Sequence, residues 1–312
     1  VRRCQCVLYS QIHCFVCYLL VSTFPRSSNI DHNTDLRVYT NNHNDEIEHH
    51  RDFDTEIFSV RFSPDDGLLV VGGGDGTMKV YSAANGRIMY QWNTSSSPDQ
   101  KFPVTSLRFR PERPDSRSKN ILLCAGSGGV VQHWHVTSGK LLHSIEEEGN
   151  QVYTVDFSND GKMFATAGRD FHVRVYDEAT KSIVNTMAGG NGLTTAGHTN
   201  RVFALKFHPT DTNILLSGGW DSTVQIWDVR VEYAVRRIFG PHICGDALDI
   251  DKKGTILTGS WRPNNQLQTW DFGTGKLIED IKYPVDVAAE EKCNLYTAQF
   301  NDLNGSLIAA GG

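Results

Sequence analysis

The sequence predicts an all-β fold built from repeated four-stranded antiparallel sheets, and three observations support this prediction. From about residue 35, short alternating strands and apolar runs recur with a period of roughly 45 residues. Glycine pairs follow the apolar runs, and dipeptides such as Asn85-Gly86 and Thr274-Gly275 separate neighbouring runs. Such dipeptides are typical of tight turns between antiparallel strands. Hydrophobic residues make up 39% of the chain and charged residues 21%, as in ordinary globular proteins.

Each repeat opens with a short strand and a turn, and six such turns can be identified. They are Phe62-Ser63-Pro64-Asp65, Phe109-Arg110-Pro111, Phe157-Ser158-Asn159-Asp160-Gly161, Phe207-His208-Pro209-Thr210-Asp211, Ile250-Asp251-Lys252-Lys253-Gly254 and Phe300-Asn301-Asp302. The second strands that follow are residues 68–73, 121–126, 163–168, 214–219, 256–260 and 307–312. A third strand ends at Val80-Tyr81, His133-Trp134, Val175-Tyr176, Ile226-Trp227 and Thr269-Trp270. With a fourth strand after the next turn, each unit is an antiparallel meander.

The alternation on the third strands indicates how the units pack. Met78 and Val80, like Val224 and Ile226, are two residues apart and therefore share one face of a strand. A four-stranded sheet cannot bury both of its faces alone, whereas sheets stacked around an axis bury each other. The predicted fold is therefore a β-propeller.

One unit carries a specific family resemblance. It contains Gly197-His198, then Phe207-His208-Pro209, then Leu216-Ser217-Gly218-Gly219-Trp220-Asp221, and finally Trp227-Asp228. This series resembles a complete WD40 repeat, and Tyr176-Asp177 and Trp270-Asp271 resemble its ending. The resemblance covers about residues 35–312 and implies a WD-repeat β-propeller.

The resemblance also implies a structural hydrogen-bond network within a blade. Its four positions correspond here to His198, Ser217, Asp221 and Trp227. Thr166 and Asp170 match two positions in the third unit, and Asp75 matches one in the first. The second unit has Gly128 where an Asp is expected, and residues 263–265 form an insertion in the fifth. Because such networks stabilise only when complete, we expect the fourth blade to be the most rigid and Gly128 to tolerate substitution.

The two chain ends allow two interpretations. Five units are complete, and the sixth has only the strands at 295–300 and 307–310. Upstream, residues 35–40 match residues 77–82, and a fourth strand could lie within 45–53. The ends would then share a sixth blade and remove two open sheet edges. The alternative is a propeller truncated at its C-terminus.

Residues 1–34 differ from the rest and are expected to be a disordered or artefactual extension. A basic start and a short apolar run resemble a signal peptide, without a small-residue cleavage site. Four cysteines lie here, namely Cys4, Cys6, Cys14 and Cys17. The other three, Cys124, Cys244 and Cys293, are too isolated for a disulfide framework, which favours a reducing intracellular compartment, cytoplasmic or nuclear.

No catalytic spacing is evident, so we expect a protein that is not an enzyme and uses no metal or cofactor. Gly72–Gly76 lies between strands and is interpreted as a turn rather than a phosphate loop. His198, Ser217 and Asp221 resemble a hydrolase triad only superficially. The runs Glu146–Glu148 and Glu290-Glu291 are expected to be exposed to solvent, like His43, His49 and His50.

Charge argues against a nucleic-acid partner. The net charge is −6, whereas binding to a phosphate backbone requires a basic surface. We also expect neither a basic stripe nor converging carboxylates in the central channel.

The face that bears the entry loops and the turns between second and third strands is the predicted partner-binding face. The residue after the first apolar residue of each opening strand is Phe58, Thr105, Tyr153, Phe203, Asp246 or Tyr296. Gly74, Arg169 and Trp220 precede the turn Asp, with Arg201 and Trp261 nearby. The predicted binding residues are Phe58, Tyr153, Arg169, Arg201, Phe203, Trp220, Trp261 and Tyr296. Aromatic rings beside Arg favour protein interfaces and can clasp a cation, although rings such as Tyr153 and Tyr296 could instead pack between blades.

We therefore predict a scaffold that binds other proteins or peptides, with no membrane association, as a subunit of a larger complex. The alternative is a substrate receptor of a cullin-type ubiquitin ligase. It depends on Trp227-Asp228-Val229-Arg230, which resembles the box that docks such receptors onto the ligase adaptor.

Overall fold

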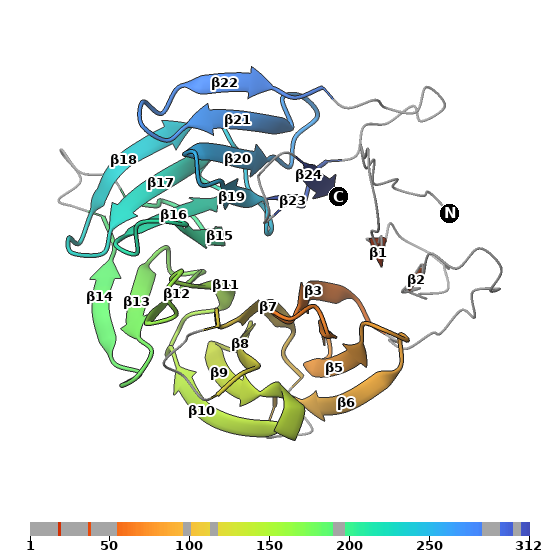
Figure 1. Ribbon diagram of the computed structural model, residues 1–312. Coiled ribbons are helices and arrows are strands. Elements are labelled where there is room, and N and C mark those ends of the chain that lie inside the picture. Colours follow the sequence, from red (N-terminus) through yellow and green to blue (C-terminus); the bar gives the residue numbers. More distant parts are fainter. Residues whose placement is uncertain are drawn as a thin grey trace, which may run out of the picture.

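The computed structural model describes residues 18–19, 37–38, 55–95, 101–112, 118–189, 197–282, 294–301 and 307–312. Within these residues, five four-stranded antiparallel sheets are arranged around a central axis (Figure 1). The predicted all-β propeller architecture is confirmed. Except for one short 3-10 turn, Val136–Ser138, the described elements are strands, and none of their helices has the length and hydropathy needed to cross a bilayer.

Each blade is a meander of four consecutive strands. Blade 1 contains β3 (Ile57–Phe62), β4 (Leu68–Gly73), β5 (Thr77–Ser82) and β6 (Ile88–Asn93). Blade 2 contains β7 (Val104–Phe109), β8 (Ile121–Gly126), β9 (Val130–His135) and β10 (Lys140–Glu146). Blade 3 contains β11 (Val152–Phe157), β12 (Met163–Gly168), β13 (Val173–Asp177) and β14 (Ile183–Met187).

The remaining strands continue this order. Blade 4 contains β15 (Val202–Phe207), β16 (Ile214–Gly219), β17 (Thr223–Asp228) and β18 (Ala234–Phe239). Blade 5 contains β19 (Leu248–Ile250), β20 (Thr255–Gly259), β21 (Leu267–Asp271) and β22 (Leu277–Asp280). A further pair, β23 (Thr297–Phe300) and β24 (Ile308–Gly311), forms a two-stranded sheet.

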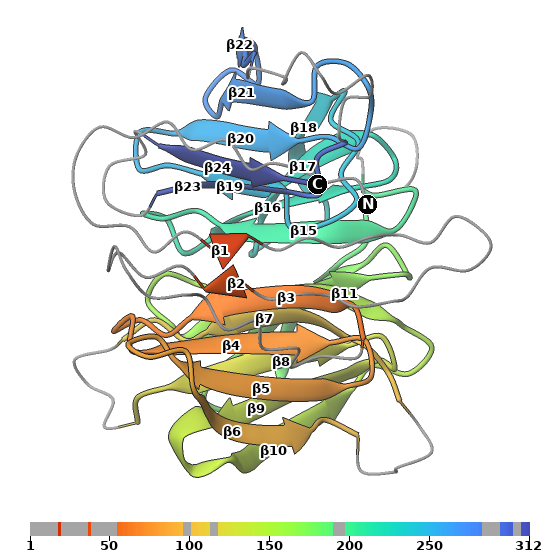
Figure 2. The same cartoon turned by 90° about the vertical axis from the view of Figure 1, so that its right-hand side faces the viewer.

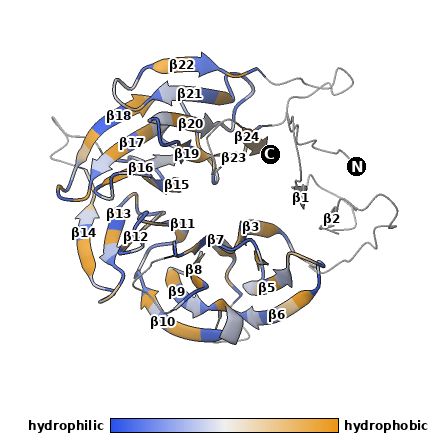
Figure 3. Ribbon diagram, viewed as in Figure 1, coloured by the Kyte–Doolittle hydropathy of each residue, from blue (hydrophilic) through white to orange (hydrophobic). Residues whose placement is uncertain are grey.

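The apolar core lies between successive blades, as the alternation on the third strands predicts. Met78 and Val80 of blade 1 are buried in one cluster with Val104 and Leu107 of blade 2. The same pattern recurs in the other clusters, where blade 3 packs on blade 4 and blade 4 packs on blade 5. By contrast, the outermost strands carry apolar residues on a half-exposed surface, which Figure 3 shows on β10 and β14. Each blade therefore depends on its neighbours for burial of its faces.

Backbone groups on the inner strands also link neighbouring blades. The N–H of Leu107 donates to Oγ of Ser59 over 3.1 Å, and the N–H of Val155 donates to Oγ of Ser106 over 3.3 Å. Further along the ring, the N–H of Phe207 donates to the carboxylate of Asp156 over 2.8 Å. Buried N–H groups need acceptors, so these side chains fix each inner strand against the preceding blade.

The expected pairing between the two chain ends is not formed. Arg37–Val38 (β2) pairs with Tyr18–Leu19 (β1), and both lie between blade 1 and the β23–β24 pair (Figure 2). β24 pairs only with β23 among the described strands. Because the short β2 is already paired with β1, it does not complete a sheet with β24. The expected strand within 45–53 and nearly all of residues 1–34 lie outside the described residues, so the boundary at residue 34 stays a prediction.

Candidate functional site

Four side chains of blade 4 form one continuous hydrogen-bonded network. His198 contacts Asp221 through Nδ1 and Ser217 through Nε2, each over 2.7 Å. The indole N–H of Trp227 donates to Oγ of Ser217, also over 2.7 Å. His198 lies in the loop before β15, Ser217 on β16, Asp221 in the following turn and Trp227 on β17. The network therefore ties the loop to two strands, and we call these four residues the blade 4 network.

The protonation of this network follows from its surroundings. Burial alone would raise the pKa of Asp221, but the hydrogen bonds from His198, Thr199 and Thr223 lower it. The ionised Asp221 thus accepts the Nδ1–H of His198, which leaves Nε2 to accept the O–H of Ser217. Ser217 is fully buried, so no substrate can reach its oxygen, and the arrangement supports a structural role.

Blade 3 has a network of different composition, centred on Glu147. The expectation that Glu146–Glu148 is wholly exposed is wrong, because Glu147 is only 7% exposed. Its carboxylate accepts hydrogen bonds from Thr166 over 2.5 Å, Tyr176 over 2.9 Å, Asn150 over 2.7 Å and Arg174 over 3.1 Å. A run of three glutamates gives no sign that the middle side chain points inward toward four donors. Glu147 and these four partners are called the blade 3 network, and Glu290-Glu291 lie outside the described residues.

Outside the blade 4 network, the residues that match only some of its positions form hydrogen bonds or ion pairs with residues close by in the chain. Asp75 accepts hydrogen bonds from the N–H and hydroxyl of Thr77, and Asp170 forms an ion pair with Arg174. In the inserted segment of blade 5, Arg262 donates to the carbonyl oxygen of Asn265. A Cβ at Gly128 would lie 2.6 Å from Cδ2 of Phe102. A larger residue at this position must therefore displace the Phe102 ring, contrary to the expected tolerance.

Several predicted face residues form a chain of ring contacts across blades 3 and 4. Tyr153 stacks on Phe203 with ring centroids 4.8 Å apart, and Phe203 lies 5.0 Å from Trp220. The guanidinium of Arg201 lies over the Trp220 ring at 5.2 Å. Tyr153 thus packs against a ring of the neighbouring blade and is also half-exposed on the face.

A pocket of about 430 Å³ continues this chain of rings toward blade 5 and β23. It is lined by Asn200, Trp220, His242, Cys244, Trp261 and Tyr296. Trp261 meets Tyr296 edge-to-face at 6.2 Å, and the indole N–H of Trp220 donates to Sγ of Cys244 over 3.1 Å. Burial raises the pKa of both the Cys244 thiol and the Tyr296 hydroxyl. Tyr153, Phe203, Trp220, Trp261 and Tyr296 are called the aromatic arc.

Two predicted face residues lie apart from the pocket. Phe58 is 37% exposed on blade 1, where its ring lies beside Gly74. Arg169 is exposed in the turn of blade 3 that corresponds to the position of Trp220 in blade 4. The structure thus brings Trp220, Trp261 and Tyr296 together and leaves Phe58 at a distance along the ring. The binding role of all these residues stays a prediction.

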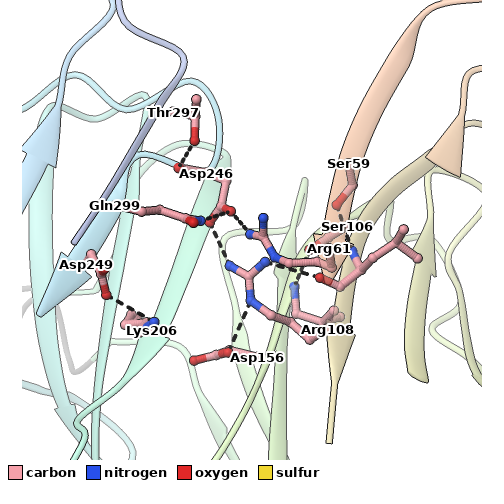
Figure 4. Close-up of polar contacts among 12 residues, drawn as sticks. Ser59, Arg61, Ser106, Arg108, Asp156, Lys206, Asp246, Asp249, Thr297 and Gln299 are labelled. Carbon is pink, nitrogen blue, oxygen red and sulfur yellow. Dashed lines mark hydrogen bonds and ion pairs between the residues drawn. The ribbon is translucent and has the colours of Figure 1, made fainter. Parts of the chain in front are cut away.

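Charged side chains gather on the inner strands, which the sequence reasoning missed. Figure 4 shows Arg61 and Arg108 meeting the carboxylate of Asp246, with Arg108 also contacting Asp156. Lys206 pairs with Asp249 over 3.0 Å. The expectation of no converging carboxylates is therefore wrong. A signal was present, because the residue before the final apolar residue of the opening strand is Arg61, Arg108, Asp156, Lys206, Asp249 or Gln299.

These carboxylates are arranged for structure rather than for acid–base chemistry. Asp246 accepts from Arg61, Arg108 and also Gln299, and Asp156 further accepts the backbone N–H of Phe207. Each of these carboxylates thus serves as a shared acceptor for several donors. They link blades across the ring axis, from blade 1 and blade 2 to blade 5.

The segment proposed as a ligase-docking box lies at the end of β17 and in the turn before β18 of blade 4. Trp227 and Val229 are buried, whereas the side chain of Arg230 is 68% exposed. Arg230 forms two hydrogen bonds to Asp228, over 2.8 and 2.5 Å. His43, His49 and His50 lie outside the described residues.

Comparison with known proteins extends these observations. The family described as "WD domain, G-beta repeat" matches residues 42–82, 139–177 and 190–228. The "Target of rapamycin complex subunit wat1" of Schizosaccharomyces pombe is 29% identical over 167 residues, which cover 54% of this chain and 50% of that protein. The "Nucleoporin Nup37" of Drosophila melanogaster is 22% identical over 244 residues, 74% of this chain and 68% of the relative.

A third relative is the "Target of rapamycin complex subunit LST8" of Saccharomyces cerevisiae, 31% identical over 110 residues. These residues cover 35% of this chain and 34% of the relative. The chain thus spans half or less of the two complex subunits that it matches.

Proposed function

The chain is a WD-repeat protein, and from this premise we propose that it is a scaffold that holds a protein or peptide partner on the aromatic arc. Two of its relatives are named as subunits of the target of rapamycin complex and a third as a nucleoporin. Relatives of this kind support a role in protein interaction. Fold alone does not identify a partner, so the proposal depends on the surface.

The observation that carries the proposal is the pocket at one end of the arc. Trp220 of blade 4, Trp261 of blade 5 and Tyr296 just before β23 line one hollow of about 430 Å³. Trp and Tyr dominate the energy of protein interfaces because each buries a large area at a small cost in side-chain entropy. The ring contacts of Trp220 with Phe203 and of Trp261 with Tyr296 hold these side chains in place before a partner arrives. A preorganised surface binds more tightly than a mobile one.

The other attributes of the protein are part of the same proposal. We propose a complex subunit that is not an enzyme, requires no metal or cofactor, and binds no nucleic acid. The net charge of −6 supports the last point. The names of the relatives and the isolated cysteines support an intracellular location, in the cytoplasm or the nucleus.

Affinity purification from native extract tests the proposal. The whole chain is used as bait in three forms: wild type, Trp220→Ala and Phe239→Ala. Trp220 lines the pocket, whereas Phe239 is a 63% exposed aromatic residue on the outer strand β18. We expect Trp220→Ala to lose partners that wild type and Phe239→Ala both retain, with the thermal unfolding temperature of the three proteins unchanged. Identical sets of captured proteins would contradict the proposal.

A further inference from the structure

We infer that the pocket binds an apolar or aromatic side chain carried by an acidic peptide segment. This inference rests on the proposed function and specifies the chemistry of the partner. It depends on what lines the pocket, on how the face of Trp220 is used, and on which nearby cations lack an acidic partner.

The pocket is poorly suited to a cationic side chain. A cation bound by aromatic rings needs an open ring face and gains from a nearby carboxylate. Here the guanidinium of Arg201 already lies over Trp220, and a second cation would be repelled by it. Among the described residues that line the pocket there is no Asp or Glu. The carboxylate of Asp221, in the turn beside Trp220, accepts hydrogen bonds from His198, Thr199 and Thr223 and is therefore fully engaged.

The surface of the pocket is mainly apolar, and aromatic rings form much of it. Trp261 and Tyr296 meet edge-to-face on one side, and Trp220 lies against Cys244 on the other. The volume, about 430 Å³, is within the range of roughly 300–1,000 Å³ usual for ligand sites. An apolar or aromatic side chain entering this hollow removes its own surface and that of the rings from water. Such burial contributes about 25 cal/mol for each Å².

The charge beside the pocket is positive and uncompensated. In the part of the chain that the structure describes, most arginines around the ring have an oxygen partner, such as Arg61 with Asp246 and Arg174 with Asp170. For Arg201 and Arg169, as for Arg87 and Arg237, no ion pair or side-chain hydrogen bond of the guanidinium is found within the described residues. Of these four, Arg201 lies over the Trp220 ring of the arc, and Arg169 occupies the turn of blade 3 that corresponds to Trp220. An acidic segment lying along the arc would supply the missing carboxylates.

A peptide selection on the intact protein tests this inference. The full chain is immobilised and screened with a phage library of random dodecapeptides, and the enriched peptides are synthesised with a fluorescent label for anisotropy titration. We expect an apolar or aromatic residue within three positions of Asp or Glu. We also expect affinity to fall at least tenfold in Arg201→Gln and in Trp220→Ala, and to decrease with added salt because the charge pairs are screened.

Matched controls separate local from global effects. Arg87 is an exposed arginine in the turn between β5 and β6, at the opposite end of the blade from the arc, so Arg87→Gln should bind like wild type. Circular dichroism of each variant checks folding. Enrichment of Lys- or Arg-rich peptides, failure to enrich any peptide, or binding that survives both Arg201→Gln and Trp220→Ala would overturn the inference. If purified partners still depend on Trp220 in any of these cases, the proposed function stands and only the partner chemistry is wrong.

Discussion

Blades 3 and 4 fill the same structural positions with different chemistry. Thr166 and Ser217 lie at matching places on their second strands, and Tyr176 and Trp227 end their third strands. At the centre, blade 4 has the imidazole of His198 and blade 3 has the carboxylate of Glu147. Both centres are buried and hydrogen-bond to the hydroxyl on the second strand. In these two blades a polar bridge occupies the same place, and it need not be a histidine.

The difference in charge between the two central groups explains a second difference between the blades, at one position on the third strand. Neutral imidazole both donates and accepts, so it can join an acid, Asp221, to a hydroxyl, Ser217. A carboxylate only accepts, so every partner of Glu147 must be a donor, and burial requires a cation to balance it. Arg174 supplies this cation in blade 3, while the same position in blade 4 is the uncharged Gln225. The identity of the central group thus sets the charge of a neighbouring strand.

The largest effect that tests this comparison is expected for Glu147→Ala. The substitution removes the acceptor of four donors and leaves Arg174 with only Asp170. Removing one member of a buried ion pair costs about 3–5 kcal/mol. Urea unfolding at neutral pH should show this loss, with Glu146→Ala as the control, since the neighbouring side chain is exposed. Equal stability of the two variants would refute a structural role for Glu147.

A smaller loss is expected for His198→Ala in blade 4. Ser217 keeps the hydrogen bond from Trp227, and Asp221 keeps those from Thr199 and Thr223. Only two hydrogen bonds disappear, which corresponds to about 1–3 kcal/mol. Measured beside Glu147→Ala in the same urea titration, His198→Ala should be the more stable of the two. The reverse order would show that the imidazole-centred network contributes more than the carboxylate-centred one.

The comparison also shows what the sequence could reveal about the molecule. The turns, the apolar alternation at Met78 and Val80 and the complete unit around Trp227 predict the propeller, because these patterns follow directly from strand geometry. The ring contacts around Trp220 follow from its place in a repeated turn. Glu147 could not be recognised, because exposed and buried glutamates look alike in a sequence. Likewise, the pairing of Arg108 with Asp246 joins residues far apart in the chain, and only the arrangement of the blades around a common axis brings them together.

Acid should weaken both networks, through Asp221 of the blade 4 network and through Asp170, which pairs with Arg174 of the blade 3 network. Burial would raise the pKa of Asp221 and of Asp170, but the hydrogen bond from His198 and the hydrogen bond and charge of Arg174 hold these pKa values below the ordinary value of 3.8. The stabilisation is therefore complete above the unfolded pKa and is lost as the pH falls through the lower folded pKa. Asp221→Asn and Asp170→Asn should each lower the free energy of unfolding at pH 7. The difference in free energy of unfolding between each variant and the wild type should become smaller below about pH 4. A difference in free energy of unfolding that stays constant from pH 7 to pH 3 would contradict a stabilising role for the ionised aspartates.

The smallest effect is expected at the end of blade 4, where the ion pair is exposed. Among the described residues, Arg230 bonds to Asp228, two residues away, and its side chain is 68% exposed. Solvent and salt screen such pairs, and the cost of ordering a long side chain offsets most of the attraction. Arg230→Ala should therefore unfold at the same urea concentration as wild type, in contrast to His198→Ala in the same blade. If Arg230→Ala abolished capture of a ligase adaptor at unchanged stability, it would also show that the exposed end of this blade is a second binding surface, separate from the aromatic arc.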